Sequence, residues 1–190
     1  ENIKFDESEI TKLRMKAVMK YCCIVATVFH FSFIFLFFYF KIYFLAYYSI
    51  FSTFLWILLY FLNRRSFVNT VILLALSETL IHTVLAVYFL GWNLGFQYWL
   101  IIAAVAVFLI PTKRISIKLG CSVIFVLAFV FLQLYSSHNK PVFIQNNIVF
   151  FILHIINIVC AFFLLAFIVY LYRSIAEKAE KNLAIEHEKS

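Results

Sequence analysis

The chain has few of the residues that make turns and few charges. It contains three glycines and two prolines in 190 residues, and 13% of its residues are charged, where soluble domains carry roughly 25%. So little glycine and proline leaves little material for the turns of a β-barrel. The low charge excludes an ordinary soluble protein. Both shortages are typical of a chain that folds largely inside a membrane.

What the chain has instead is apolar and aromatic. Hydrophobic residues make up 65% of it, and phenylalanine alone occurs 25 times. The apolar runs are about 20 residues long, the length at which a helix crosses a hydrocarbon core of roughly 30 Å. The composition therefore predicts an all-α, multi-pass membrane protein.

The apolar runs predict six transmembrane helices. The stretch from Tyr21 to Leu62 is interrupted only by Lys41, and one straight helix of that length would reach about 63 Å, so the chain must fold back near Lys41. Polar breaks separate the later runs. The predicted spans are Tyr21 to Phe40, Ile42 to Leu62, Phe67 to Leu90, Leu94 to Ile110, Ile115 to Tyr135, and Asn147 to Tyr172.

The distribution of lysine and arginine predicts the orientation. Fourteen of the 16 fall in segments on one side of the six-span layout: Lys4, Lys12, Arg14, Lys16, Lys20, Arg64, Arg65, Lys113, Arg114, Lys118, Arg173, Lys178, Lys181 and Lys189. Only Lys41 and Lys140 fall on the other. Basic loops stay inside, so both termini are predicted to be cytoplasmic. The basic residues would face anionic lipid headgroups, and no basic patch interleaved with aromatics indicates nucleic acid.

Three parts follow from this layout: a cytoplasmic N-terminal segment (residues 1–20), a six-helix transmembrane domain (21–172) and a cytoplasmic transducer helix or short coiled coil (173–190). We expect no cleavable targeting signal, because a polar stretch precedes the first span. The four cysteines all fall inside spans, where a reduced thiol behaves as a small apolar residue, so no disulfide framework is expected.

One acidic residue lies inside the membrane. Eight of the nine acidic residues are in the two tails, and the ninth, Glu78, lies near the middle of the third span. An ionised carboxylate there costs about 2.5 to 3.5 kcal/mol, so it should face the bundle interior, be protonated or have a partner. His82 lies one helical turn further on, within a small and polar stripe. That stripe comprises Ala75, Glu78, Thr79, His82 and Ala86.

Two other spans carry similar polar faces. The first places Cys23, Ala26, Thr27 and His30 on one face, and the sixth places His154, Asn157, Cys160 and Ala161. Their depths would allow His30, Glu78, His82 and His154 to meet. Such a cluster could bind a transition metal, hold a haem between two histidines, or act as a protonatable switch. The plainer alternative is interhelical hydrogen bonding that sets helix register.

The connection after the third span is a second unusual feature. It holds two of the three glycines and two of the three tryptophans but no charge: Gly91, Trp92, Asn93, Leu94, Gly95, Phe96, Gln97, Tyr98 and Trp99. An aromatic belt at the membrane interface explains these residues. Alternatively, a tight turn dips Trp92, Asn93 and Gln97 into an outward-facing pocket suited to an apolar or lipid-like ligand.

The polar tail predicts a signalling helix. Ala176, Ala179 and Leu183 share one face and are surrounded by glutamate and lysine, which is compatible with a short parallel coiled coil in a homodimer. No turn signal separates this tail from the sixth span.

The end of the tail resembles a known signalling family. The run Leu183-Ala184-Ile185-Glu186-His187-Glu188-Lys189-Ser190 resembles the segment ahead of the catalytic domain in bacterial membrane-bound class III adenylate cyclases. Gly91-Trp92, followed by Gly95 and Gln97, resembles the corresponding loop of six-helix cyclase anchors. The resemblance covers the whole layout, with about a dozen specific residues.

The resemblance implies a membrane receptor and dimerisation domain in a bacterial inner membrane. Class III cyclases, which are lyases, convert ATP to cyclic AMP at a homodimer interface, with two aspartates holding two Mg or Mn ions. No catalytic residue of that kind can be assigned in this chain. The resemblance implies that a membrane or periplasmic ligand is sensed in the bundle and that the signal passes through the tail.

Other functions share the same sequence features. The anchor and helix could serve a diguanylate cyclase or a histidine kinase, since a bundle does not fix function. A small transporter or channel would show discontinuous helices or an internal repeat. A membrane enzyme using Glu78 and the histidines is the weakest alternative, because no metal-ligand spacing such as HExxH is present.

Overall fold

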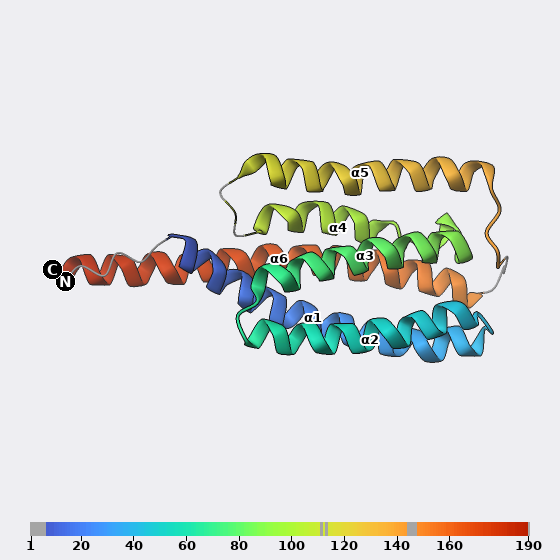
Figure 1. Ribbon diagram of the computed structural model, residues 1–190, viewed down its shortest axis with the longest axis horizontal. Helices are drawn as coiled ribbons and strands as arrows, with labels where there is room; N and C mark the ends of the chain where they lie inside the picture. The colour runs from blue at the N-terminus through green and yellow to red at the C-terminus, as the bar shows by residue number, and fades with distance from the viewer. Residues whose placement is uncertain (1–6, 111, 113, 144–147, 190) are drawn as a thin grey trace.

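The computed structural model is a bundle of antiparallel helices (Figure 1). It describes residues 7–110, 112, 114–143 and 148–189; the side chains of 7–11, 13–14, 109, 171–172, 175–176 and 178–189 lie outside that description. Its elements are α1 (Glu7–Tyr39), α2 (Tyr43–Arg64), α3 (Val68–Leu90), η1 (Trp92–Leu94), α4 (Tyr98–Ala106), η2 (Val107–Leu109), α5 (Ile115–His138) and α6 (Ile148–Lys189). No strand occurs among these residues, so the predicted all-α class is confirmed.

Five of the helices are long and apolar enough to cross a membrane. Their candidate spans are Met15–Tyr39, Tyr43–Arg64, Val68–Leu90, Ile115–His138 and Ile148–Tyr170, among the described residues. Each overlaps a predicted span, and the first begins earlier than expected because α1 is already helical from Glu7. The multi-pass membrane character is therefore supported by length and composition.

The fourth predicted span, Leu94 to Ile110, is wrong as a single long helix. The chain there forms η1, an irregular turn, the 9-residue helix α4 and the 3-residue turn η2. The regular part reaches about 20 Å, short of a hydrocarbon core of roughly 30 Å. The cause is Gly95, whose φ of 80° places it in the left-handed region and ends η1, where glycine has no steric penalty.

The first hairpin bends where it was predicted to. Lys41 has a φ of 59°, an uncommon conformation for a residue with a side chain. Ile42 N–H returns to the Phe37 carbonyl oxygen at 2.9 Å and Lys41 N–H to Phe38 at 3.0 Å, which closes α1 and starts α2. The fold-back near Lys41 is confirmed, although neither glycine nor proline is present to signal it.

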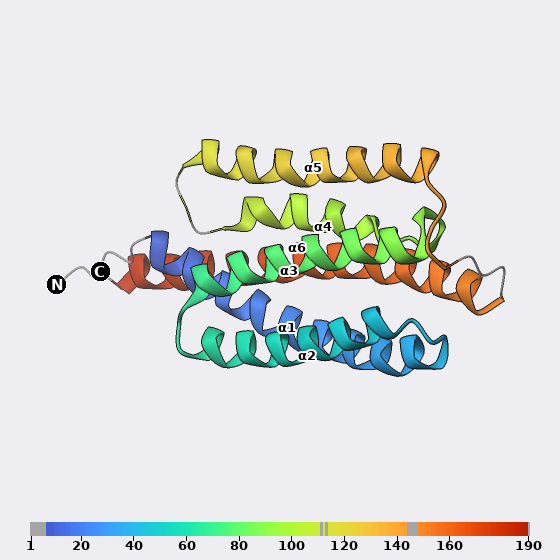
Figure 2. The same ribbon diagram turned by 45° about the vertical axis from the view of Figure 1, so that its right-hand side comes forward.

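The helices differ greatly in how much of their surface is enclosed. Of the apolar window of α3, 44% is buried inside the molecule, against 11% for α5. Figures 1 and 2 show α5 at one edge, separated from α1 and α2 by α4, α3 and α6. The helix carrying Glu78 is therefore the most enclosed of the five candidate spans.

The last helix is continuous from the bundle into the tail. α6 runs for 42 residues, from Ile148 to Lys189, and extends well beyond the end of the bundle at which α1 begins (Figure 1). Just past the apolar window, Arg173 Nε pairs with Glu177 Oε1 at 2.7 Å across one helical turn, an arrangement that favours helix on an exposed surface. No break separates the apolar and polar parts.

Two of the three apolar clusters among the described residues lie on either side of a polar layer. One cluster includes Phe37, Leu45 and Ala86, and the other includes Cys23, Leu59 and Val71. Between these levels the helices α1, α2 and α3 bury polar side chains instead: His30, Ser49, Ser52, Thr53, Glu78, His82 and Thr83. This layer near the middle of the bundle is the candidate site.

Candidate functional site

Glu78 lies at the centre of the polar layer, with both carboxylate oxygens engaged. Ser52 Oγ donates a hydrogen bond to Oε1 at 2.7 Å, and Trp56 Nε1 donates to Oε2 at 3.1 Å. Ser52 and Trp56 lie one turn apart on α2, so a single face of that helix orients the carboxylate. Its side chain is 2% exposed, so the two hydrogen bonds replace water that the site excludes.

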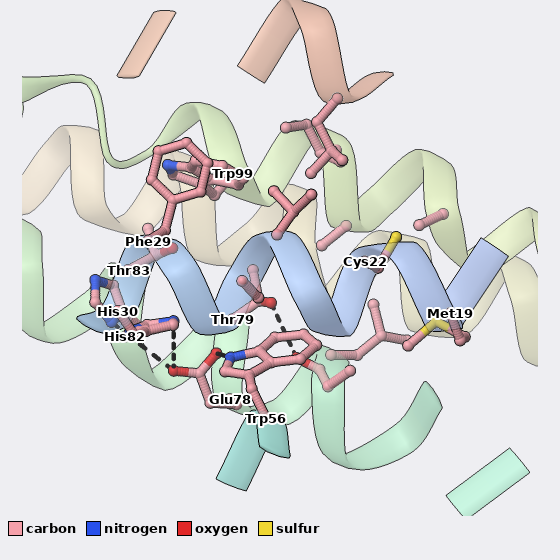
Figure 3. A pocket seen from close by; sticks show the side chains of 18 of the residues that line it. Met19, Cys22, Phe29, His30, Trp56, Glu78, Thr79, His82, Thr83 and Trp99 are labelled. Atoms are coloured by element: carbon pink, nitrogen blue, oxygen red, sulfur yellow. Dashed lines mark hydrogen bonds and ion pairs between the residues drawn. The ribbon is translucent and has the colours of Figure 1, made fainter. Parts of the chain in front are cut away.

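Two imidazoles complete the cluster from two different helices. His30 Nε2 of α1 lies 3.4 Å from Glu78 Oε1, and His82 Nδ1 of α3 lies 3.8 Å from the same oxygen. Figure 3 shows both rings directed at the carboxylate. The cluster therefore joins α1 and α3 directly, and joins α2 through the hydrogen bonds to Glu78.

The cluster has the composition of a metal-binding group. One ligand atom from each of His30, Glu78 and His82 lies within 4.8 Å of the others. Both histidines also carry a buried Nδ1 without a hydrogen-bond partner in the described part of the chain. Two imidazoles and a carboxylate suit zinc and other divalent transition metals rather than magnesium or calcium, which prefer oxygen.

A haem between His30 and His82 does not fit this geometry. A haem held by two histidines lies between the two rings, whereas here the ring centroids are 4.6 Å apart and the planes are inclined by 75°. Phe33 and Phe96 also pack against His82, with centroids at 6.0 and 5.8 Å. The arrangement leaves room for an ion or a proton between the polar groups, but not for a macrocycle.

A cavity of about 130 Å³ adjoins the cluster. Its polar corner is formed by His30, Glu78 and His82, and its walls are otherwise mostly apolar. The remaining wall residues come mainly from α1, α3, α4 and α6, and include Cys22, Phe29, Ile72, Trp99, Ile102, Leu164 and Ile168. Among the residues that the structure describes, no lysine or arginine lines it, so the basic groups that face the carboxylate there are the two imidazoles.

His154 does not join the cluster. Its ring lies against the turn before α4, where Nδ1 would be 3.2 Å from a Cβ built on Gly95. The structure thus brings together three of the four histidine and glutamate residues that the sequence offered as metal ligands. His154 differs because α6 meets the α3–α4 connection at this level rather than the polar face of α3.

Asn157 connects α6 to the irregular turn. Asn157 is 1% exposed, its Nδ2 donates to the Leu94 carbonyl oxygen at 2.8 Å, and its Oδ1 accepts a hydrogen bond from Trp99 Nε1 at 3.5 Å. Irregular backbone at membrane depth needs partners inside the protein. Asn157 supplies one for the Leu94 carbonyl. Trp99, which donates to Asn157, also lines the cavity.

Trp92, Asn93 and Gln97, the predicted ligand residues of the α3–α4 connection, lie in different surroundings. Trp92 is half-buried and packs edge-on against Phe129 of α5, with ring centroids 5.1 Å apart. Asn93 is exposed, whereas Gln97 is 1% exposed and its Oε1 has no partner among the residues described. The turn therefore does not gather Trp92, Asn93 and Gln97 into one pocket.

The predicted transducer residues Ala176, Ala179 and Leu183 lie on the helical backbone of α6. Their side chains fall outside the described residues. The helix is described, and the coiled-coil face remains a prediction.

Sequence reasoning missed the residues of α2 that hold Glu78. Ser49, Ser52, Thr53 and Trp56 are all buried, and their spacing of three, four and seven is that of one helical face. This stripe was readable in the sequence. It was overlooked because serine, threonine and tryptophan are common in membrane helices and none of the four carries a charge.

Comparison of the chain with protein-family models, with curated proteins and with solved structures finds no match.

Proposed function

We propose that the chain is a membrane receptor domain that controls an output domain through α6. By the resemblance of its tail, the output is a class III adenylate cyclase and the working unit is a homodimer in a bacterial inner membrane. In this proposal the chain crosses the membrane six times, with both termini in the cytoplasm. The observation that carries the proposal is that α6 lines the buried cavity and continues unbroken to Lys189.

The contacts of α6 with the cavity support signal transfer. Leu164 and Ile168 form part of its wall, and Asn157 is hydrogen-bonded to the turn that precedes α4. A ligand that changes the cavity's shape would therefore act on α6 without an intermediate loop. A helix transmits rotation or sliding over its length because its backbone hydrogen bonds are internal.

The position of α4 supports the six-pass arrangement. Figure 1 shows α4 antiparallel to both α3 and α5, so the chain reverses direction at each connection although α4 is short. In the proposed orientation Arg64, Arg65 and Lys118 lie at the cytoplasmic end, and Lys41 lies at the opposite end. This distribution follows the positive-inside rule.

A fusion experiment tests the proposal. Residues 1–190 are joined to a class III cyclase catalytic domain that needs dimerisation, and cyclic AMP formation is measured in membranes. We expect the fusion to be more active than the soluble catalytic domain at equal concentration, and its output to change when lipids, quinones or metal ions are screened. Equal activity together with no response to any of them would contradict the proposal.

Matched fusions identify the output class. The same residues are joined to a diguanylate cyclase domain and to a histidine-kinase domain. The proposal expects the largest regulated change with the cyclase, because the Glu186 to Ser190 run resembles the cyclase connection. A larger response from either rival would replace the cyclase with that domain.

A small transporter is the second candidate, and one observation favours it. The fourth segment is interrupted at Gly95, and Gln97 is buried beside the break, its Oε1 without a partner in the described part of the chain. Transporters often build sites from such broken helices. Flux of protons or metal ions in proteoliposomes is the test. Flux that an Asn157→Leu variant abolishes would support transport over reception.

A further inference from the structure

We propose that His30, Glu78 and His82 bind one divalent transition-metal ion, with Zn²⁺ as the best match, between α1 and α3. The inference deepens the proposed receptor function by naming its ligand class, and its physiological meaning rests on that function. Binding itself is measured separately. The metal-binding inference and the proposed receptor function can therefore fail independently.

The distances between the ligand atoms suit a tetrahedral ion. Zinc bonds of 2.0 to 2.2 Å at tetrahedral angles place neighbouring ligand atoms about 3.3 Å apart. His30 Nε2 and Glu78 Oε1 are 3.4 Å apart, and His82 Nδ1 and the same oxygen are 3.8 Å apart. The three ligand atoms lie within 4.8 Å of one another, so side-chain rotations that shorten these separations are needed to bring them onto one ion.

The surroundings of Glu78 match those of a metal-ligating carboxylate. Ligating carboxylates are held by hydrogen bonds from neighbouring groups, as Glu78 is by Ser52 and Trp56. His82 Nδ1, one of the two nitrogens facing Glu78, is buried without a hydrogen bond in the described part of the chain. A metal ion would supply the partner that this lone pair lacks.

Charge also favours a cation at this point. An ionised carboxylate near the middle of a membrane must have a positive partner or take up a proton, and among the residues that the structure describes no lysine or arginine lines the cavity beside Glu78. A divalent ion provides that charge without a proton on either histidine.

The cavity leaves a coordination position open. Three protein ligands with a fourth position for water or a small molecule are typical of zinc sites that exchange ligands. The adjoining space of about 130 Å³ exceeds what one water needs. Trp99 of α4 and Leu164 of α6 line the same cavity. A ligand that extends from the ion along this cavity would contact the helix that leaves the bundle.

Binding is tested with Co²⁺, whose visible absorption reports tetrahedral nitrogen and oxygen ligands. The full chain is purified in detergent with an affinity tag that contains no histidine and is titrated with Co²⁺, then with Zn²⁺. We expect one Co²⁺ per chain and its displacement by Zn²⁺. Metal analysis of the freshly purified protein gives an independent value of occupancy.

Variants locate the site. His82→Ala and Glu78→Gln should weaken binding by at least about 100-fold, and Trp56→Phe, which leaves the ligands in place, by about 10- to 100-fold. His154→Ala is the matched control and should bind as the unaltered protein does. Helical circular dichroism and size exclusion identify any variant that fails to fold, and Trp56→Phe keeps the test decisive in that event.

Three outcomes are distinguished. No Co²⁺ absorption at equimolar metal, or equal loss in His82→Ala and His154→Ala, would overturn the metal site. Binding that does not alter cyclic AMP output of the fusion supports the site but overturns its role as the signal. An output that responds to lipids or quinones without metal binding supports the receptor and overturns the metal inference.

Discussion

Asn157 of α6 donates a 2.8 Å hydrogen bond to the carbonyl oxygen of Leu94, across 63 positions of sequence. The acceptor belongs to η1, where the backbone is irregular. Removing the amide leaves this carbonyl buried without that partner, and orphaned groups inside a membrane are costly. The pair therefore joins the bundle's least regular segment to its longest helix.

We expect Asn157→Leu to lower the free energy of unfolding by about 1 to 2 kcal/mol, since interhelical hydrogen bonds in membranes are worth roughly 0.6 to 2 kcal/mol. Unfolding in mixed micelles monitored by circular dichroism gives the value. Asn139→Ala is the control, because its exposed side chain bonds only to Tyr135 within its own helix segment. Equal effects of both substitutions would contradict the structural role of Asn157.

Ser52→Ala removes one of the two hydrogen bonds to Glu78. We expect a loss of about 1 kcal/mol in the free energy of unfolding. Ser77→Ala is its matched control: Ser77 is exposed and donates only to the Leu73 carbonyl in α3, so its change should stay within about 0.5 kcal/mol. A Ser52→Ala protein as stable as Ser77→Ala would show that the carboxylate does not depend on α2.

The glycines give opposite predictions. Gly95→Ala places a Cβ at a φ of 80°, 3.2 Å from His154 Nδ1, and should cost about 1 to 3 kcal/mol. Gly120→Ala in α5 meets nothing within 4 Å and should be neutral or stabilising by up to about 1 kcal/mol, because alanine is the better helix former. Thermal unfolding of both variants measures the difference. Similar melting temperatures would contradict the observed turn.

Insertions into the tail test transmission by rotation. One alanine added after Lys181 turns everything beyond it by about 100°, whereas seven alanines return the phase to within about 20°. In the cyclase fusion we expect one alanine to change cyclic AMP output strongly and seven to restore it. Output that declines steadily with inserted length would indicate sliding or simple loss of contact instead.

The proposed orientation is testable with single cysteines. In a variant without the four native cysteines, Lys41→Cys should react with a membrane-impermeant maleimide in intact cells. Arg65→Cys should react only after the cells are opened, because the six-pass layout places it on the cytoplasmic side. Both residues are exposed and lie in connections between helices. The reverse pattern would invert the topology and place α6's tail outside.

Much of the site was predictable from chemistry alone. Glu78 is an isolated acid in an apolar run, and His82 lies one helical turn away. The helical spacing and the free-energy cost of a charge inside the membrane together predict an enclosed polar face. His30 was predicted to join them because it lies at a similar depth in the first predicted span. His154 has a comparable depth in α6 but meets Gly95 instead, because rotation of a helix about its axis depends on packing that no local pattern records.

The fourth segment shows the other limit of sequence reasoning. Leu94 to Ile110 is apolar throughout its length apart from Gln97, so hydropathy predicts one span. Whether Gly95 continues a helix or adopts a positive φ depends on partners elsewhere, here the Asn157 amide and the close approach of α6. Hydropathy indicates whether a residue prefers lipid or water, and it carries no information on the conformation of the backbone. The break could not be read from it.

Because α6 is long, a small tilt inside the bundle would move its far end by a larger distance. From Asn157 to Lys189 the helix extends about 48 Å at 1.5 Å per residue, with its pivot held by the Leu94 carbonyl. A tilt of only about 5° at that pivot would carry the far end through about 4 Å. That is close to the diameter of an α-helix backbone. A displacement small enough to fit inside the bundle is thereby enlarged to the scale at which neighbouring protein domains engage or separate.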